Sequence, residues 1–231
     1  MHISWLGLSA LKIETKDAVL VTDPFAPTLT KKPLRAKADV VTISIADDPA
    51  RNTLSGIQGE PFVIDHPGEF EVKGIFIQGI SVSGSDAGRG KAQQEMEKHK
   101  HVSTSPAGEH PVTVFTLDVE DMRLAHLGGL RTRPSGETIE RLNGVDVLLI
   151  PVGGSGTLDA DAAAAVVNDI EPRMVIPIHF ASDGAVGPKL ASASAFLKEM
   201  GASNVKPVDR LLIKKRDLPG EEETRVVVFH T

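Results

Sequence analysis

The sequence predicts an α/β (α+β) fold in which two β-sheets pack face to face and helices cover the outside. Short strands follow one another closely in the first part of the chain, and from about residue 146 strands alternate with helices. That succession is typical of packed sheets with outer helices. The stretches 40–45 and 146–152 are apolar almost throughout, as expected of strands that are covered on both faces.

Hydrophobic patterning and turn residues predict the individual elements. Strands are expected over residues 2–6, 9–14, 18–22, 40–45, 61–64, 69–72, 75–82, 112–117, 122–126, 146–152 and 174–177. Helices are expected over residues 49–54, 135–142, 158–170 and 189–200, with Ser135 and Thr157 as N-caps. A last hairpin is expected from 210–215 and 225–230, and 25–37 reads as a surface loop.

One domain is expected over residues 1–231, with a polar inserted loop at 84–110. A chain of 231 residues fits one large domain. The inserted loop is rich in glycine and charged residues, which favours loop structure. Within it, His99 and His101 have a spacing that could chelate a metal, but their flanking lysines favour a solvated stretch.

Composition excludes several classes of site and partner. The chain has no cysteine, so disulfides, thiolate nucleophiles and cysteine-bound zinc are excluded. A net charge of −6 and 4% aromatic residues disfavour nucleic-acid binding. No apolar run approaches the length of about 18 residues that a membrane span needs, and no signal peptide is evident. The simplest compartment is the cytoplasm, and a small-molecule ligand or self-association is compatible with these features.

Carboxylates and histidines stand at the ends of three predicted strands. Asp47 and Asp48 follow one strand, His126 ends another, and His179 follows a third. Ligand sites in α/β proteins gather at such strand ends, so we predict that these residues share a site. Each also has a simpler interpretation, because Asp48 before Pro49 is a good helix N-cap and a histidine at a strand end is usually structural.

Six short motifs extend this pattern over nearly the whole chain outside 84–110. They are Trp5-Leu6-Gly7-Leu8-Ser9, Thr22-Asp23-Pro24-Phe25, Pro67-Gly68-Glu69-Phe70-Glu71-Val72, His126-Leu127-Gly128-Gly129-Leu130, Leu148-Leu149-Ile150-Pro151-Val152-Gly153-Gly154 and Ile176-Pro177-Ile178-His179-Phe180. Together they resemble the Zn-dependent hydrolase branch of the metallo-β-lactamase superfamily, which includes the ascorbate-6-phosphate lactonases. The resemblance implies a four-layer αββα sandwich, with two packed sheets and helices on both outer faces.

The same resemblance implies a metal-binding motif from which this sequence departs. The family pattern Ser/Thr-His-x-His-x-Asp-His stands here as Thr42-Ile43-Ser44-Ile45-Ala46-Asp47-Asp48. Both histidines of His-x-His are therefore isoleucine, and the last histidine is aspartate. Gly129 replaces the aspartate that would bridge two metals, and Leu8 replaces a histidine at the edge of the active site.

Carried over position by position, the first metal site keeps only His126. The second keeps Asp47 and His179, with Asp48 in place of histidine. Since a zinc site typically uses three or four protein ligands and the two-metal mechanism lacks its bridge, we predict no di-metal centre. The four remaining side chains could bind one ion such as Zn²⁺, Mn²⁺ or Fe²⁺, and a site without metal is an equal alternative.

Three functions are therefore compared. The favoured one is a weakly active or non-catalytic family member that uses the old cleft for small-molecule binding or assembly. The alternative is a mononuclear metal-dependent hydrolase of a lactone, ester or phosphodiester, in which a metal-bound water is the nucleophile. Metal-independent hydrolysis by Asp–His acid–base chemistry is the weakest, because no nucleophile or oxyanion site is evident.

Overall fold

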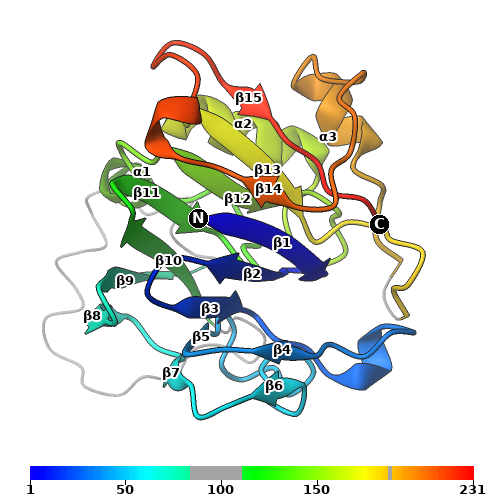
Figure 1. Ribbon diagram of the computed structural model, residues 1–231. Helices are drawn as coiled ribbons and strands as arrows, with labels where there is room; N and C mark the ends of the chain where they lie inside the picture. Colours follow the sequence, from blue (N-terminus) through cyan, green and yellow to red (C-terminus); the bar gives the residue numbers. More distant parts are fainter. Residues whose placement is uncertain (84–110, 187–188) are drawn as a thin grey trace, which may run out of the picture.

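Two large β-sheets packed face to face form the centre of the computed structural model, which describes residues 1–83, 111–186 and 189–231 (Figure 1). The six-stranded sheet contains β1 (His2–Gly7), β2 (Ala10–Glu14), β3 (Val19–Thr22), β5 (Val40–Thr42), β7 (Phe62–Ile64) and β14 (Leu211–Leu212), in the order β14-β1-β2-β3-β5-β7. The seven-stranded sheet contains β8 (Gly68–Val72), β9 (Ile75–Val82), β10 (Val112–Val119), β11 (Met122–His126), β12 (Val147–Pro151), β13 (Met174–Ile178) and β15 (Arg225–Val226), in the order β15-β13-β12-β11-β10-β9-β8. The expected loop at 84–110, with His99 and His101, lies outside the described residues.

An aliphatic core fills the space between the two sheets. Leu11 and Leu20 enter it from the six-stranded sheet, and Phe115, Leu149 and Ile176 enter it from the seven-stranded sheet. All five side chains are fully buried. Burying apolar surface of this kind is the main driving force for holding sheets together. The sequence-based expectation of two sheets in face-to-face packing is confirmed.

The outer surfaces of the two sheets are covered differently. Helices α1 (Gly136–Arg141), α2 (Ala160–Ile170) and α3 (Ser194–Glu199) share one apolar cluster with the outer face of the seven-stranded sheet. The outer face of the six-stranded sheet is covered by the 3₁₀ turn η1 (Pro27–Leu29) and the short strands β4 (Ala36–Lys37) and β6 (Ile57–Gln58). Among the described residues, no α-helix belongs to this second outer layer, so the expectation of helices on both outer faces is wrong for the six-stranded sheet.

The expected helix over 49–54 is wrong, because the chain forms turns there. The Asp48 carboxylate does accept a hydrogen bond from the Ala50 amide, as an N-cap would, and it forms an ion pair with Arg51. The residues that follow, Asn52-Thr53-Leu54-Ser55, include three with low helix propensity and form no apolar stripe. Asp48 therefore forms the hydrogen bond of an N-cap, but no helix follows it.

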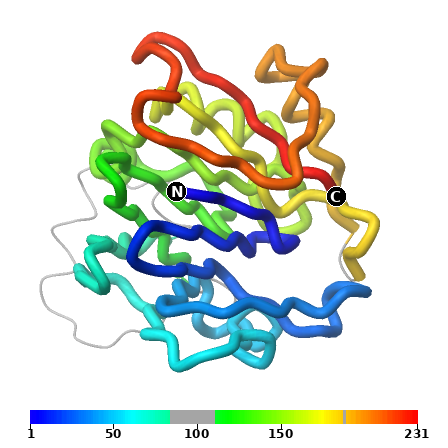
Figure 2. The backbone as a smooth tube through the Cα atoms, in the orientation of Figure 1, coloured from blue at the N-terminus to red at the C-terminus, as the bar shows by residue number. Residues whose placement is uncertain are grey.

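The expected last hairpin is also wrong. Strand β14 pairs antiparallel with β1, whereas β15 pairs in parallel with β13 of the other sheet. The N- and C-terminal parts of the chain consequently lie side by side (Figure 2). Strands β14 and β15 each form an edge strand, of the six-stranded and the seven-stranded sheet respectively. A hydrophobic pattern alone does not indicate which sheet a short strand joins.

Two helices begin later than expected. Helix α2 starts at Ala160, and the Asp159 side chain accepts a hydrogen bond from the Ala162 amide in place of the expected Thr157 cap. Helix α3 starts at Ser194. Before it, Ala191 forms backbone hydrogen bonds outside any helix: its amide donates to the Gly153 carbonyl, and its carbonyl accepts from the Ala181 amide. None of the helices in the described part of the chain is both long and apolar enough to cross a bilayer.

Candidate functional site

Several strand ends and their following turns meet at one edge of the two sheets. Strands β3 and β5 of the first sheet run in parallel, as do β11, β12 and β13 of the second. Their carboxyl ends deliver Asp23, Ser44, His126 and His179 to this edge, and the turn between β1 and β2 adds Ser9. His126 and His179 both contact Ser9, and the prediction that they share a ligand site with Asp47 and Asp48 stays a prediction.

A buried carboxylate ties three of these segments together. Asp23 accepts one hydrogen bond from the Ser44 amide and one from the Ser44 hydroxyl, each at 2.6 Å. The Ser44 hydroxyl oxygen in turn accepts a hydrogen bond from the Gly129 amide at 3.1 Å. The Ser44 carbonyl accepts from the Thr113 amide, so the chain leaves the sheet after Thr42, earlier than the expected strand over 40–45.

The two histidines are linked through Ser9. The His126 Nε2 atom donates to the Ser9 carbonyl oxygen at 3.0 Å, and the His179 Nδ1 atom lies 3.1 Å from the Ser9 hydroxyl. Both imidazoles are buried. Their other nitrogens, Nδ1 of His126 and Nε2 of His179, have no hydrogen-bond partner within the structure described.

Burial sets the ionisation of this cluster. Burial and, to a smaller extent, the nearby Arg51 guanidinium together lower the pKa of His179 to about 4. Burial also lowers the pKa of His126, against the opposing charge of Asp23, so both imidazoles are neutral near neutral pH. For Asp23 burial raises the pKa, against the charge of His126 and the hydrogen bonds from Ser44.

The predicted carboxylate ligands, Asp47 and Asp48, are more exposed than the two buried histidines. Asp47 is exposed, and Asp48 is half-buried and holds the Ala50 amide and the Arg51 side chain. Within residues 1–83, 111–186 and 189–231, no group of three or more histidine, aspartate or glutamate side chains could hold a metal ion. This arrangement does not fit a metal centre, and assigning Asp47, Asp48, His126 and His179 to a one-ion site stays a prediction.

Two buried isoleucines flank Ser44. Ile43 and Ile45 are both buried, with 4% and 2% of their surface exposed. A Cβ atom added to Gly129 would lie 2.4 Å from Cδ1 of Ile45, and one added to Gly128 would lie 2.3 Å from the Ser44 hydroxyl. The turn at 128–129 therefore rests directly on the segment 44–45, and a side chain at 129 would require Ile45 to move.

Little space remains beside this contact. The cavity between Leu8, Phe25, Ile45, Arg51 and His179 has a volume of about 10 Å³. A single water molecule needs roughly 10–15 Å³ measured in this way. This cavity is consequently too small for an organic molecule in this conformation.

Three residues of this cluster were missed by the sequence-based prediction. Asp23 appeared only as part of the motif Thr22-Asp23-Pro24-Phe25, and its carboxylate accepts from Ser44, which lies beyond the neighbouring strand of the sheet. Ser9 and Ser44 received no role. Ser44 stands between two isoleucines where the pattern otherwise stays apolar, and that isolated hydroxyl was the signal that could have identified it.

A family model described as the beta-lactamase superfamily domain matches residues 2–179. The chain belongs to this superfamily. It is 26% identical over 206 residues to a UPF0173 protein of Pyrococcus abyssi, covering 87% of this chain and 90% of that protein. It is also 26% identical over 198 residues to YtkL of Bacillus subtilis, named a UPF0173 metal-dependent hydrolase, covering 78% of this chain and 86% of YtkL.

A solved structure agrees with this membership. A Thermotoga maritima protein, described as a candidate Zn-dependent hydrolase of the metallo-β-lactamase superfamily, superimposes with a TM-score of 0.73 and 27% identity. The match covers 99% of this chain and 98% of that protein. The metallo-β-lactamase fold predicted from the sequence is thereby confirmed.

Proposed function

We propose that this protein is a superfamily member that has lost its metal centre and acts by binding rather than by metal-dependent hydrolysis. The observation that carries the proposal is the contact between Ile45 and the 128–129 turn, which fills the place beside Gly129 with hydrocarbon. Motifs such as Trp5-Leu6-Gly7 and Pro67-Gly68-Glu69 support a narrower kinship with the lactonase-containing branch.

The polar residues of the cluster support a structural role. Asp23 and Ser44 use their hydrogen bonds to join the two sheets at this edge, and Ser9 joins the histidines to the same edge. Buried polar groups that satisfy one another in this way rigidify a fold. A cavity of about 10 Å³ also argues against the old cleft as the place where a ligand binds.

The alternative, a mononuclear metal-dependent hydrolase, has one observation in its favour. The buried Nδ1 of His126 and Nε2 of His179 have no hydrogen-bond partner in the structure described. A neutral imidazole nitrogen is a common metal ligand. Recruiting Asp48 to them would require its contacts with Ala50 and Arg51 to break. That rearrangement makes the alternative less favourable than a metal-free protein.

Hydrolysis assays on metal-loaded protein separate the two functions. The protein is incubated with Zn²⁺ or Mn²⁺ and assayed with bis-p-nitrophenyl phosphate, p-nitrophenyl acetate and a γ-lactone, and Bacillus subtilis YtkL is treated identically as a comparison. We expect no rate above that of the metal in buffer. Metal-dependent turnover that is lost in the variant His179→Asn would overturn the proposal; asparagine is chosen because His179 has a φ of 51°, which asparagine tolerates.

A further inference from the structure

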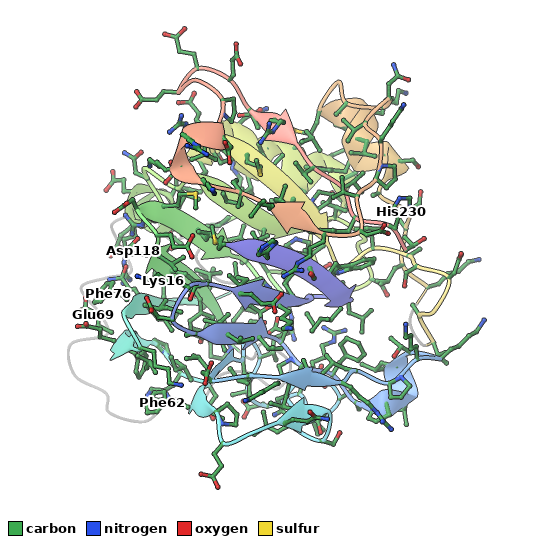
Figure 3. All side chains as sticks on the ribbon, in the orientation of Figure 1. Lys16, Phe62, Glu69, Phe76, Asp118 and His230 are labelled. Carbon is green, nitrogen blue, oxygen red and sulfur yellow. The ribbon has the colours of Figure 1, made fainter. Side chains whose placement is uncertain are left out.

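A second and much larger cavity lies at the end of β1, outside the closed cleft. Its volume is about 720 Å³. Small-molecule sites typically measure about 300–1,000 Å³. Its walls are formed by the end of β1, the segment 30–35, the turn 182–184 and residues 230–231. The β1 arrow points towards the side where the C-terminal end lies, and His230 marks that side in Figure 3 (Figures 1 and 3).

Hydrogen bonds hold the walls of this cavity in place. The Lys31 amide donates to the Gly184 carbonyl and the Val186 amide donates to the Leu29 carbonyl, each at 2.7 Å. These two bonds fix the segment 30–35 against the turn that follows His179. The cavity is therefore largely preformed, as binding sites for small molecules usually are.

The floor of the cavity contains a fixed aromatic ring. Trp5 stacks on Phe180 with ring centroids 4.7 Å apart, and its indole nitrogen donates to the Leu8 carbonyl oxygen at 2.8 Å. Leu6 and Leu34 add apolar surface beside it. An indole held at both its face and its nitrogen offers a flat surface against which a planar or aliphatic ligand can pack.

Two unpaired cations line the same cavity. Lys32 and Arg35 are exposed, and neither side chain forms an ion pair or hydrogen bond within the part of the chain that the structure describes. Asp183 also lines the cavity and could accept a hydrogen bond from a ligand hydroxyl or amino group.

We propose that this cavity binds a small organic anion, with its apolar or aromatic body against Trp5 and its phosphate or carboxylate held by Lys32 and Arg35. The guanidinium of Arg35 presents a planar pair of donors that suits either group, and the Lys32 ammonium adds a point charge. The inference rests on the binding role proposed above and supplies its site and ligand class. It moves the ligand from the closed cleft to the neighbouring surface.

Trp5 makes the cavity directly observable. It is the only tryptophan, and the chain has no tyrosine, so selectively excited protein fluorescence reports on this ring alone. Phenyl phosphate and benzoate are titrated into the protein, with neutral benzyl alcohol as the matched control, and heats of binding are measured on the same samples. We expect saturable binding of at least one anion and much weaker binding of benzyl alcohol. The comparison of the two anions distinguishes a phosphate site from a carboxylate site.

Charge variants locate the binding. Arg35→Ala and Lys32→Ala should each weaken anion binding by about tenfold or more, because a charge-assisted hydrogen bond is lost. Lys31→Ala is the matched control, since Lys31 neighbours Lys32 and does not line the cavity, and it should change affinity by less than about threefold. Circular dichroism confirms that each variant is folded.

Three results would overturn the inference. They are the absence of both heat and fluorescence change at millimolar anion, equal affinity for benzyl alcohol, or equal effects of Arg35→Ala and Lys31→Ala. Its failure is distinguishable from failure of the proposed function, because metal-dependent hydrolysis is measured separately. A protein that binds phenyl phosphate through Arg35 and also hydrolyses a diester would keep this site and lose the metal-free function.

Discussion

The contact between Ile45 and the 128–129 turn is the residue-level feature on which the proposed loss of the metal centre depends. The family resemblance implies metal ligands at positions 43, 45 and 129, where this sequence has isoleucine, isoleucine and glycine, none of which can coordinate metal. The sequence does not indicate which side chains lie beside position 129. Only the structure brings Cδ1 of Ile45 to the place that a side chain at 129 would occupy.

A double-mutant cycle tests this contact. Gly129→Ala should lower the free energy of unfolding by about 1–3 kcal/mol, because the added methyl group meets Ile45. In the Ile45→Val background the clashing Cδ1 atom is absent, so the cost of Gly129→Ala should fall by about 1 kcal/mol or more. Denaturant unfolding of the four proteins measures both terms.

The matched control for the cycle is Gly136→Ala at the start of α1. A Cβ atom there would have nothing within 4 Å, so this change should be neutral or slightly stabilising. Equal costs of Gly129→Ala with and without Cδ1 of Ile45 would mean that the isoleucine does not fill the site.

The buried histidine His179 gives the protein a defined response to acid. Its pKa is about 4 in the folded protein, below the ordinary value of 6.5. The unfolded chain therefore binds a proton that the folded protein does not, and stability attributable to His179 is lost as pH falls from about 6.5 to about 4. The full difference corresponds to about 3 kcal/mol.

Comparison with His179→Asn isolates this contribution. Asp23, whose pKa is raised by burial, acts in the opposite direction, and His126 acts in the same direction as His179. Both groups are present in the two proteins and largely cancel in the difference. Urea unfolding across this pH range should show the wild type losing stability relative to His179→Asn, and parallel pH profiles would contradict the burial of a neutral imidazole.

At the scale of elements, strand ends and caps decide where the site forms. Most strands were predictable because alternating or continuous apolar runs bounded by turn residues have few other interpretations. The two failures have different causes. The helix expected at 49–54 had a valid start signal but was followed by residues of low helix propensity. The hairpin expected at 210–230 had two valid strands, but each paired with a different sheet.

The start of α2 provides a test at this scale. Asp159→Ala should lower the free energy of unfolding by about 1 kcal/mol, because the Ala162 amide loses its capping acceptor. Asp161→Ala is the matched control, since Asp161 is exposed in the first turn and contributes only through the helix dipole, about 0.3–1 kcal/mol. Thermal unfolding that ranks Asp161→Ala above Asp159→Ala would assign the cap to another residue.

At the scale of the whole molecule, the two sheets close over one polar cluster and leave an open cavity beside it. The fold was predictable, and the parallel strands β11, β12 and β13 place His126 and His179 at the same edge of the sheet. The cavity beside Trp5 was not, because it is built from loops whose contacts depend on backbone hydrogen bonds such as Lys31 to Gly184. Loops are where sequence patterning carries least information.

The measurement that tests the central claim most directly is the metal content of the protein. The protein is produced with Zn²⁺ or Mn²⁺ in the medium, dialysed, and analysed for metal per chain, alongside its His179→Asn variant and YtkL. The account predicts no stoichiometric metal in this protein and no difference between it and the variant. One or two ions per chain, retained through dialysis and lost in His179→Asn, would contradict it.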